Sequence, residues 1–469
     1  MIPTLVILAT LTAAFIVTLR VGVAATFTYV LLPSLLLVFT VRPLEIPGLP
    51  DITTLAGVGY GTVLAFLLKG GEPLRFRFHL VDAAMIALSV VAIVSSMMAE
   101  QLWTGVSTAG QEFFEWLVPY FMARIAFTYR HYRLRAAQLL AGLAMMLGVV
   151  ALYEMRIDPY FFTRKILAPF GLTSTNWVMV LGRFGLFRAQ ASFSHPIDLG
   201  NGGALLACII SVLACTSGRT LKTPWVALGV GSSLIMTLAS LSFTSFVAAA
   251  AIGAIFITAR LSRLTGYLLL PLSIVVIISY AVFTAHLVNT PPELPERPDQ
   301  AFNSSYHMRH VIIQTVWPEV TRAGLWGYGI TWDINTTGLE SLDNAYLLFI
   351  LRQGWLYLFA FLFLLSIVNI YGGMAVLSVR DGTARVPVAA GVAGLVGTML
   401  GMYTVFFGFI YSRLFIILLG LTVTMCQQVF IRAAGRLPDY EADDAAQASA
   451  PPPQRRGAFA RRQVRLAAR

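Results

Sequence analysis

The chain has 469 residues, of which 57% are hydrophobic and only 12% are charged, and its formal net charge is +11. A soluble globular domain of this length does not have that composition, whereas a bundle of membrane-spanning helices does. Basic connectors on one side of a membrane and contact with anionic lipid explain the positive excess, so the charge does not indicate a nucleic-acid partner.

Apolar runs long enough to cross a bilayer follow one another along most of the chain. They lie at about residues 2–19, 21–41, 52–68, 81–98, 109–127, 136–154, 199–216, 224–240, 242–259, 264–284, 344–370, 387–409 and 410–432. No basic segment precedes the first run, so we expect residues 2–19 to be a retained helix rather than a cleaved signal peptide. The pattern predicts an all-α, polytopic membrane helix bundle of about 12–13 spans.

The connectors between these runs differ in charge, and the basic ones predict the orientation. The basic connectors hold Lys69, Arg75, Arg77, Arg130, Arg133, Arg135, Arg219, Lys222, Arg260, Arg263, Arg380 and Arg385. Because basic connectors stay on the cytoplasmic side, two long segments, at about 155–198 and 285–343, are expected outside. The N-terminus is then outside and the C-terminus inside.

The C-terminal segment has a different composition from the rest of the chain. Residues 433–469 combine an acidic stretch, Pro451–Pro453 and a set of arginines. Such a segment does not bury enough apolar surface to fold alone, so it is predicted to be a disordered basic cytoplasmic tail that touches anionic lipid. Residues 1–432 form the membrane domain.

The cysteines and the polar residues of the membrane domain give no sign of a metal site. Cys208, Cys215 and Cys426 lie inside apolar segments, which is typical of small core residues rather than of a disulfide framework or a metal cluster. His307 and His310 share a helical spacing, but no third ligand is near them in the sequence, so we expect neither a metal nor another cofactor.

The first outside segment, 155–198, mixes aromatic and basic residues. Residues 159–162 and 177–180 are aromatic or apolar, and arginines and a lysine are interleaved with them. That mixture predicts short helices in the membrane interface. The segment ends with His195 before Pro196, which predicts an extended turn at the start of the next helix.

The second outside segment leads into a helix and contains most of the remaining polar side chains. It begins as a polar loop at Tyr306–His310, passes through Trp317-Pro318 and Gly327-Tyr328-Gly329, and enters an apolar helix near Asp343-Asn344. Long loops of this kind are costly to order and usually carry function, so we interpret it as one wall of an active site.

Both segments resemble the signatures of the bacterial O-antigen ligase and O-antigen or exopolysaccharide polymerase family. The first signature is matched by Arg188, Phe193, His195, Pro196, Leu199 and Gly200, with Glu154 ending the helix before it. The second is matched by Arg309, Trp317, Pro318, Gly327, Gly329, Asn344, Tyr346, Leu347 and Gly354. The order of elements is similar over most of residues 100–430.

The resemblance implies a metal-independent membrane glycosyltransferase at the outer face of the bacterial inner membrane. A hydroxyl of the acceptor attacks the anomeric carbon of a saccharide carried by polyprenyl diphosphate, and the lipid diphosphate leaves. The diphosphate then needs guanidinium partners, and Arg188 and Arg309 stand at the matching positions. His195, Asn344, Tyr346, Arg352 and Arg413 complete the expected substrate-binding set.

The chain departs from the family pattern at several positions, including residues 242–245, which lack the arginine of the family's Ser-Arg pair. Asp343 stands where the family has a His that is thought to help activate the acceptor, so Asp343 is the candidate base, with His307 and His310 as competitors. Arg352 replaces a commonly acidic residue, and Asp198 stands near the usual Asn after His-Pro. Arg352 lies deep in its helix, and Glu115 or Glu154 is its expected partner.

Other roles for these residues stay open. Arg188 and Arg309 could anchor the protein to phospholipid headgroups, and Asp343-Asn344 could cap the helix that follows. His195 fits a turn residue, and Gly327-Tyr328-Gly329 fits a tight turn better than a phosphate loop. We favour a polymerase of O-antigen or exopolysaccharide over a ligase to a lipid core, with a transporter or flippase of a lipid-linked saccharide as the rival. Membrane lipids and other polysaccharide-assembly proteins are the expected partners.

Overall fold

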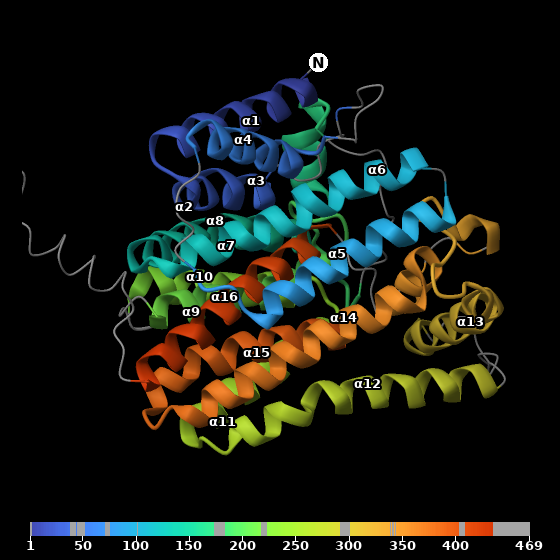
Figure 1. Ribbon diagram of the computed structural model, residues 1–469. Helices are drawn as coiled ribbons and strands as arrows, with labels where there is room; N and C mark the ends of the chain where they lie inside the picture. Colours follow the sequence, from blue (N-terminus) through green and yellow to red (C-terminus); the bar gives the residue numbers. More distant parts are fainter. Residues whose placement is uncertain are drawn as a thin grey trace, which may run out of the picture.

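The computed structural model describes residues 2–37, 44, 52–70, 76–100, 102–172, 183–216, 223–290, 301–337, 339, 342, 344–402 and 409–434. Within these ranges the chain forms helices and no β-strand. In the same ranges, nine helices are long and apolar enough to cross a membrane. The predicted all-α, polytopic membrane helix bundle is therefore confirmed (Figure 1).

The helices follow the predicted apolar runs closely. In chain order the α-helices are α1 (Ile2–Arg20), α2 (Val23–Thr26), α3 (Leu32–Leu37), α4 (Thr54–Leu68), α5 (Leu80–Ala99), α6 (Leu102–Gln111), α7 (Val118–Thr128), α8 (Arg130–Arg156), α9 (Pro196–Thr216), α10 (Pro224–Ala239), α11 (Phe243–Leu261), α12 (Thr265–Asn289), α13 (Ala301–Arg322), α14 (Ala345–Ser378), α15 (Gly382–Met402) and α16 (Phe409–Ala433). Short π-helical and 3₁₀ segments are η1 (Phe27–Leu31), η2 (Glu112–Leu117), η3 (Phe162–Leu167), η4 (Ala168–Phe170) and η5 (Ile334–Thr337).

The predicted runs outside the nine long helices are also helical. Val23–Leu37, Thr54–Leu68 and Pro224–Ala239 are shorter apolar helices. The run predicted at 109–127 lies in α6, η2 and α7, which follow one another without a break. A π-helical turn interrupts that path at Glu112–Leu117, and such turns often occur at functional positions. The short helices expected in the first outside segment are η3 and η4.

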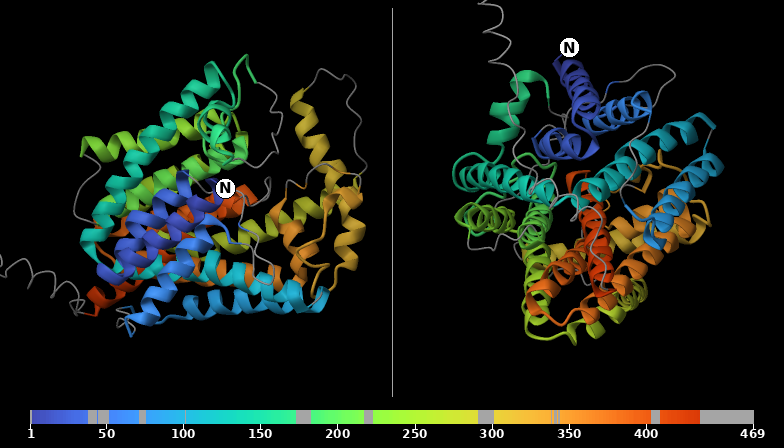
Figure 2. Two further views of the ribbon diagram at one scale, coloured as in Figure 1. Left: turned by 90° about the horizontal axis from the view of Figure 1, so that it is seen from above. Right: turned by 60° about the vertical axis from the view of Figure 1, so that its left-hand side comes forward.

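Successive helices run in opposite directions and give the bundle two distinct ends (Figures 1 and 2). We call the loop end the one where α5, α8, α10 and α12 finish and where α9, α11 and α14 begin. The helix α13 lies at this end. The opposite end, where α7, α9, α14 and α16 finish, is the tail end. Both long segments that the sequence placed together are therefore at the loop end.

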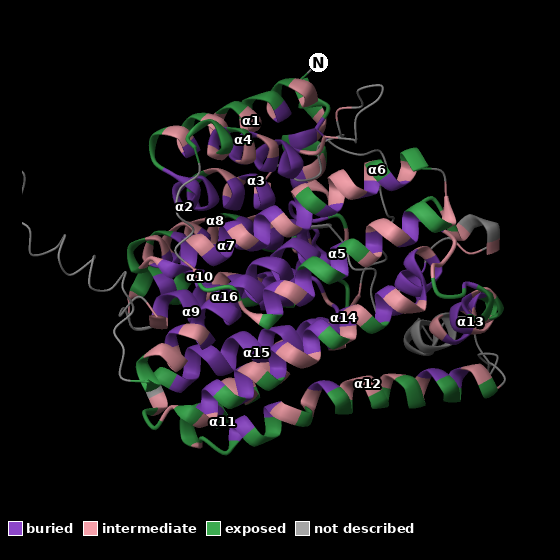
Figure 3. Ribbon diagram, in the orientation of Figure 1, coloured by how far each residue is buried: buried purple, intermediate pink, exposed green. Residues whose placement is uncertain are grey.

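The centre of the bundle consists of α9, α15 and α16, which are mostly buried (Figure 3). The helices α1, α11 and α12 lie at the periphery and expose most of their apolar side chains. On α12 the exposed residues include Leu268, Ile274, Val275, Ile278 and Val282. Apolar side chains exposed along a spanning helix face the hydrocarbon of the bilayer.

One sequence expectation is wrong. The stretch Tyr306–His310 was expected to be a polar loop, but it lies inside the helix α13. The buried side chains of α13 recur at helical spacing, because Ile312, Val316 and Val320 are all on the face that packs toward α12 and α14. The sequence thus contained an amphipathic helical pattern, but in the residues that follow Tyr306–His310. The tail beyond residue 434, with the predicted disordered segment, lies outside the described residues.

Candidate functional site

Glu154 organises the segment that follows α8. Its carboxylate is buried at the end of α8 and accepts hydrogen bonds from the backbone N–H groups of Phe162 (3.0 Å), Gln190 (2.8 Å) and Ala191 (2.7 Å). A buried carboxylate is stable when its oxygens are hydrogen-bonded, and here the backbone supplies those bonds. Glu154 therefore fixes the path of residues 183–195 and is not the partner of Arg352 that the sequence suggested.

Arg188 is held at the loop end by the turn between α10 and α11. Its Nε donates a hydrogen bond to the carbonyl oxygen of Ser240 at 3.0 Å, and the residue is only 9% exposed. Burial lowers the pKa of His195 to about 4, and the positive charge of the nearby Arg188 contributes to this shift. The structure thus brings together the two chemically active residues of the first signature.

His195 occupies the extended turn that Pro196 predicted. Its Nδ1 accepts a hydrogen bond from the backbone N–H of Ile197 at 3.2 Å, which places His195 at the start of α9. A neutral imidazole with an accepting Nδ1 carries its proton on Nε2. His195 is therefore a neutral hydrogen-bond donor at physiological pH, with a pKa near 4.

The segment before α14 docks onto a break in that helix. At Gly354 the backbone leaves the helical conformation, with φ 81° and ψ 175°. The N–H groups of Tyr328 and Gly329 bond to the carbonyl oxygens of Leu351 and Arg352 at 2.7 and 2.9 Å. The hydroxyl of Ser95 on α5 donates to the carbonyl oxygen of Gln353 at 2.7 Å. The backbone groups released by the break are thus satisfied by the chain itself.

This docking explains the glycines of the second signature. Gly327, Gly329 and Gly354 all have positive φ, which side chains other than glycine rarely adopt. A Cβ on Gly327 would meet the backbone N of Gly354 at 2.6 Å, and a Cβ on Gly354 would meet the carbonyl oxygen of Leu325. The chain turns at residues 324–326 and only bends at Tyr328, so the tight turn lies just before Gly327-Tyr328-Gly329, and Gly327 and Gly354 serve close backbone packing.

Arg352 lies beside the break and faces residues that the sequence did not connect to it. Its Nη2 is 3.5 Å from the carbonyl oxygen of Trp332, and Asp333 and Glu100 are the acidic groups that act on its charge. Glu100 in turn accepts hydrogen bonds from the N–H and the hydroxyl of Thr331, both at 2.8 Å. Neither of the partners expected from the sequence pairs with Arg352, because both are used elsewhere.

Glu115 belongs to a second ion pair, with Arg413. Arg413 at the start of α16 donates to Glu115 on η2, and both side chains are less than a tenth exposed. Thr53 donates a hydrogen bond to the other oxygen of Glu115 at 2.6 Å, and the guanidinium of Arg413 lies 5.1 Å from the ring centre of Trp116. Arg413 is therefore committed to this contact between helices within the described part of the chain.

An apolar groove runs between α11, α12 and α15 along much of the bundle. Its volume is about 750 Å³, and it extends from Thr258 and Thr265 near the tail end to Phe283 near the loop end. Leu268 and Val275 line it and are exposed at the surface of α12, so the groove opens toward the hydrocarbon of the membrane. Its shape and lining suit a hydrocarbon chain.

Tyr346 of the second signature lines the loop end of this groove, next to the helix cap Asn344. Asn344 caps α14, and its Oδ1 accepts from the N–H groups of Tyr346 (3.1 Å) and Leu347 (3.2 Å). The hydroxyl of Tyr280 also reaches Asn344 Oδ1, at 3.4 Å, and the rings of Tyr280 and Tyr346 lie 4.7 Å apart. Tyr280 and Tyr346 both line the groove. The cap expected at Asp343-Asn344 is thus made by Asn344.

The remaining predicted residues are not all placed in one site. His310 is buried, and its Nε2 lies 2.6 Å from the carbonyl oxygen of Thr290, which ties α13 to the end of α12. Arg309, its neighbour on α13, is half-buried at the loop end. Asp343 and the side chain of His307 lie outside the described residues. The structure therefore unites Arg188 with His195, and Asn344 with Tyr346, on elements that share the loop end.

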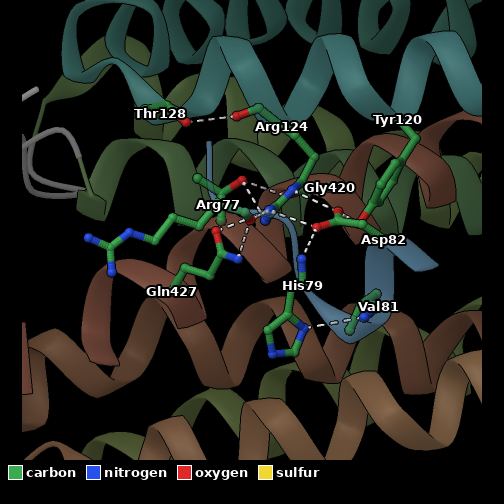
Figure 4. A network of polar contacts seen from close by, with 10 residues as sticks. Arg77, His79, Val81, Asp82, Tyr120, Arg124, Thr128, Gly420 and Gln427 are labelled. Carbon is green, nitrogen blue, oxygen red and sulfur yellow. Dashed lines mark hydrogen bonds and ion pairs between the residues drawn. The ribbon is translucent and has the colours of Figure 1, made fainter. Parts of the chain in front are cut away.

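Sequence reasoning missed a buried ionic cluster at the tail end (Figure 4). Asp82 and Arg124 are fully buried, and Arg124 Nε and Asp82 Oδ1 are 3.2 Å apart. The hydroxyl of Tyr120 donates to Asp82 at 2.6 Å, and Gln427 on α16 accepts from Arg124 at 3.0 Å. The sequence does place Asp82 and Arg124 inside predicted apolar runs. Ionisable residues in such runs are rarely left without a partner, so these two could have been expected to pair.

Comparison of the chain with protein-family models, curated proteins and solved structures gives no match.

Proposed function

We propose that the protein is a membrane glycosyltransferase that uses a saccharide linked to polyprenyl diphosphate. In the proposed reaction the acceptor hydroxyl oxygen bonds to the anomeric carbon, and the bond from that carbon to the diphosphate breaks. Polyprenyl diphosphate leaves, and the hydroxyl proton passes to a base. The likeness of both loop-end segments to the O-antigen ligase and polymerase family supports this proposal.

The observation that carries the proposal is the position of the apolar groove. The groove opens to the hydrocarbon region and ends at Tyr280 and Tyr346, next to the capped start of α14. Met399 and Leu400 also line it, and the next residue, Gly401, adjoins the buried amide of Asn201 on α9. A groove for a hydrocarbon chain that leads to buried polar groups suits a substrate with a lipid tail and a polar head.

The diphosphate needs fixed positive charge at the same end. Arg188 on the segment before α9 and Arg309 on α13 belong to elements of the loop end (Figure 2). Guanidinium groups pair with phosphate oxygens through two parallel hydrogen bonds and stay charged at any physiological pH. We assign these two arginines to the leaving diphosphate, and the neutral His195 beside Arg188 to a hydrogen bond with substrate.

Asp343 is the proposed base. In the sequence it directly precedes Asn344, which caps α14. His310 is a weaker candidate, because its ring is buried against the end of α12. The proposal places the loop end on the outer side of the bacterial inner membrane and the tail on the cytoplasmic side. Within it, chain extension of a polysaccharide is favoured over ligation to a lipid core.

A transporter of a lipid-linked saccharide is the second candidate, and the break in α14 favours it. Discontinuous helices often line the substrate path of transporters. Here, however, the carbonyl oxygens at the break are already bonded to residues 328–329 and to Ser95. The break therefore offers few free backbone groups to a substrate, which is why we place the transporter second.

Reconstitution into liposomes with a defined polyprenyl-diphosphate oligosaccharide tests the proposal. We expect longer lipid-linked chains, measured by gel separation of the labelled saccharide, with loss of at least about 100-fold in Arg188→Ala and Arg309→Ala because an ionic donor to the leaving group is removed. Arg322→Ala is the matched control, since Arg322 lies on the same helix as Arg309 and is largely exposed.

The products separate the alternatives. Transfer to an added lipid core would make the protein a ligase, and movement of an unchanged donor between leaflets would make it a transporter. Growth at the wild-type rate in both arginine variants would overturn the assignment of the diphosphate site.

A further inference from the structure

The first two turns of α9 carry buried polar atoms without a hydrogen-bond partner. Asp198 and Asn201 are each 1% exposed and stand three positions apart, so they lie on one face of the helix. Asp198 Oδ2 accepts from the hydroxyl of Ser194 at 2.8 Å. Across the part of the chain that the structure describes, Asp198 Oδ1 and both Asn201 side-chain atoms have no partner.

These missing hydrogen bonds lower the stability of the protein unless a ligand or water supplies them. A buried donor or acceptor left without a hydrogen bond costs about 1–3 kcal/mol. Three such atoms on one helical face, at the loop end, are therefore a persistent cost to the protein. Unsatisfied groups of this kind are a mark of binding sites, where a ligand or ordered water completes the bonds.

Asn201 on the same face packs against α15, a helix that also lines the groove for a hydrocarbon chain. A Cβ added to Gly401 would lie 3.0 Å from Asn201 Nδ2 and 2.5 Å from the hydroxyl of Tyr411. Gly401 directly follows Met399 and Leu400, which line the groove. The backbone of α15 therefore lies between the Asn201 amide and the groove.

The atoms without partners select the ligand class. They comprise a carboxylate oxygen and an amide oxygen, which accept hydrogen bonds, and an amide nitrogen, which donates them. A diphosphate offers only acceptors, so it would leave the amide oxygen of Asn201 without a donor, and a lipid tail would leave every atom unsatisfied. Neighbouring hydroxyl groups of a saccharide both donate and accept, and they match this set.

We propose that Asp198 and Asn201 form a saccharide subsite that binds adjacent hydroxyl groups of a sugar ring. The assignment rests on the proposed function, because that reaction places a saccharide beside the lipid diphosphate. In this assignment Arg188 and Arg309 bind the charged leaving group, whereas Asp198 and Asn201 in the first turns of α9 bind the sugar.

The variant Asn201→Leu tests the subsite through binding and stability rather than through transfer. The protein is reconstituted in nanodiscs, and binding of methyl glycosides of glucose, galactose, mannose and rhamnose is measured by saturation-transfer NMR. We expect at least one glycoside to bind, and Asn201→Leu to weaken it at least about tenfold. Its thermal midpoint should not fall, since the variant removes two unsatisfied polar atoms and keeps the same branched shape with four heavy atoms.

Asn369→Leu is the matched control. Asn369 lies on α14, is fully buried, and has no hydrogen-bond partner for either side-chain atom among the described residues. Its replacement should be equally well tolerated in the thermal midpoint but should leave glycoside binding unchanged. Asp198→Asn, which exchanges an acceptor for a donor in a similar shape, should weaken binding as Asn201→Leu does.

Each outcome decides between a subsite and a structural role. A lower thermal midpoint in Asn201→Leu with wild-type glycoside binding would overturn the subsite, and so would the absence of binding by all four glycosides to the wild type. Chain growth with unaffected glycoside binding in Asn201→Leu would leave the proposed function standing without the subsite. Weakened glycoside binding without any transfer activity would leave the subsite standing without the proposed function.

Discussion

Two buried polar regions of this bundle are built in opposite ways. At the tail end, the guanidinium of Arg124 contacts Asp82, Gln427 and the carbonyl oxygen of Arg77 (Figure 4). At the loop end, Asp198 and Asn201 are just as deeply buried, but three of their polar atoms have no partner in the described residues. A cluster whose charges are paired with one another joins helices, whereas a cluster whose polar groups are left unpaired is suited to bind something else.

The comparison predicts that changes at the two ends affect different quantities. Tail-end substitutions should lower stability and change function only through loss of folded protein. Loop-end substitutions on the Asp198 face should change binding at nearly constant stability. Many enzymes show this trade-off between stability and activity at their sites.

The largest effect is expected at the tail-end ion pair. Arg124→Met removes the guanidinium and leaves the Asp82 carboxylate buried beside Tyr120. Removing one partner of a buried pair costs about 3–5 kcal/mol, because the remaining charge is uncompensated. Thermal unfolding of the purified protein in detergent should show this loss.

An exposed ion pair provides the control. Arg322 and Glu319 on α13 are 3.1 Å apart, but the Arg322 side chain is 70% exposed. Arg322→Met should change stability by no more than about 1 kcal/mol, because water screens the pair. Equal losses in Arg124→Met and Arg322→Met would contradict the structural role of the tail-end cluster.

An intermediate effect is expected where the second signature docks onto α14. Gly354→Ala places a Cβ against the carbonyl oxygen of Leu325 at a positive φ of 81°. We expect a loss of more than about 1 kcal/mol, because alanine is strained in that conformation. The bonds of Tyr328 and Gly329 to α14 should weaken, and faster hydrogen exchange at those two amides is the direct measurement.

Gly231→Ala is the matched control for this change. Gly231 lies in α10, and a Cβ there would meet no heavy atom within 4 Å. Alanine should be neutral or slightly stabilising at this position, since it restricts the unfolded chain. Unchanged amide exchange at Tyr328 and Gly329 in Gly354→Ala would show that the docking does not depend on the break.

The effect that is smallest at neutral pH is the contribution of His195 titration to stability at the loop end. The pKa of His195 is lowered from 6.5 to about 4 in the folded protein. Between these two pH values the His195 side chain is therefore neutral in the folded protein but binds a proton in the unfolded chain. Because the unfolded state binds more protons in this range, the free energy of unfolding decreases as the pH falls from about 6.5 to about 4. The difference between wild type and His195→Gln in thermal unfolding isolates it, and identical pH profiles would show that His195 is not held neutral.

The sequence predicted the fold well and the site only in part. Long apolar runs identified the helices, because a bilayer requires continuous hydrophobic segments and tolerates little else. His195 before Pro196 correctly indicated the turn at the start of α9. Residues 306–310 were misjudged as a loop, because their polar side chains masked the apolar spacing of Ile312, Val316 and Val320.

The partners of charged residues could not be predicted in the same way. Arg352 was expected to meet Glu115 or Glu154, yet Glu115 pairs with Arg413 and Glu154 bonds to backbone N–H groups. Sequence spacing gives the depth of a charge in its own helix but not which neighbouring helix faces it. That choice depends on packing between helices that are distant in the chain.

By itself, the amino-acid sequence determined that this protein is a bundle of membrane helices and which segments connect them. It did so because the transfer of each side chain into hydrocarbon is a local property that adds along the chain. Only the tertiary structure decided that the apolar groove reaches Tyr346 of α14, that Asp82 meets Arg124, and that Asp198 and Asn201 lack partners among the described residues. Those facts depend on how distant helices pack, and hydrogen bonds between them form only at short range.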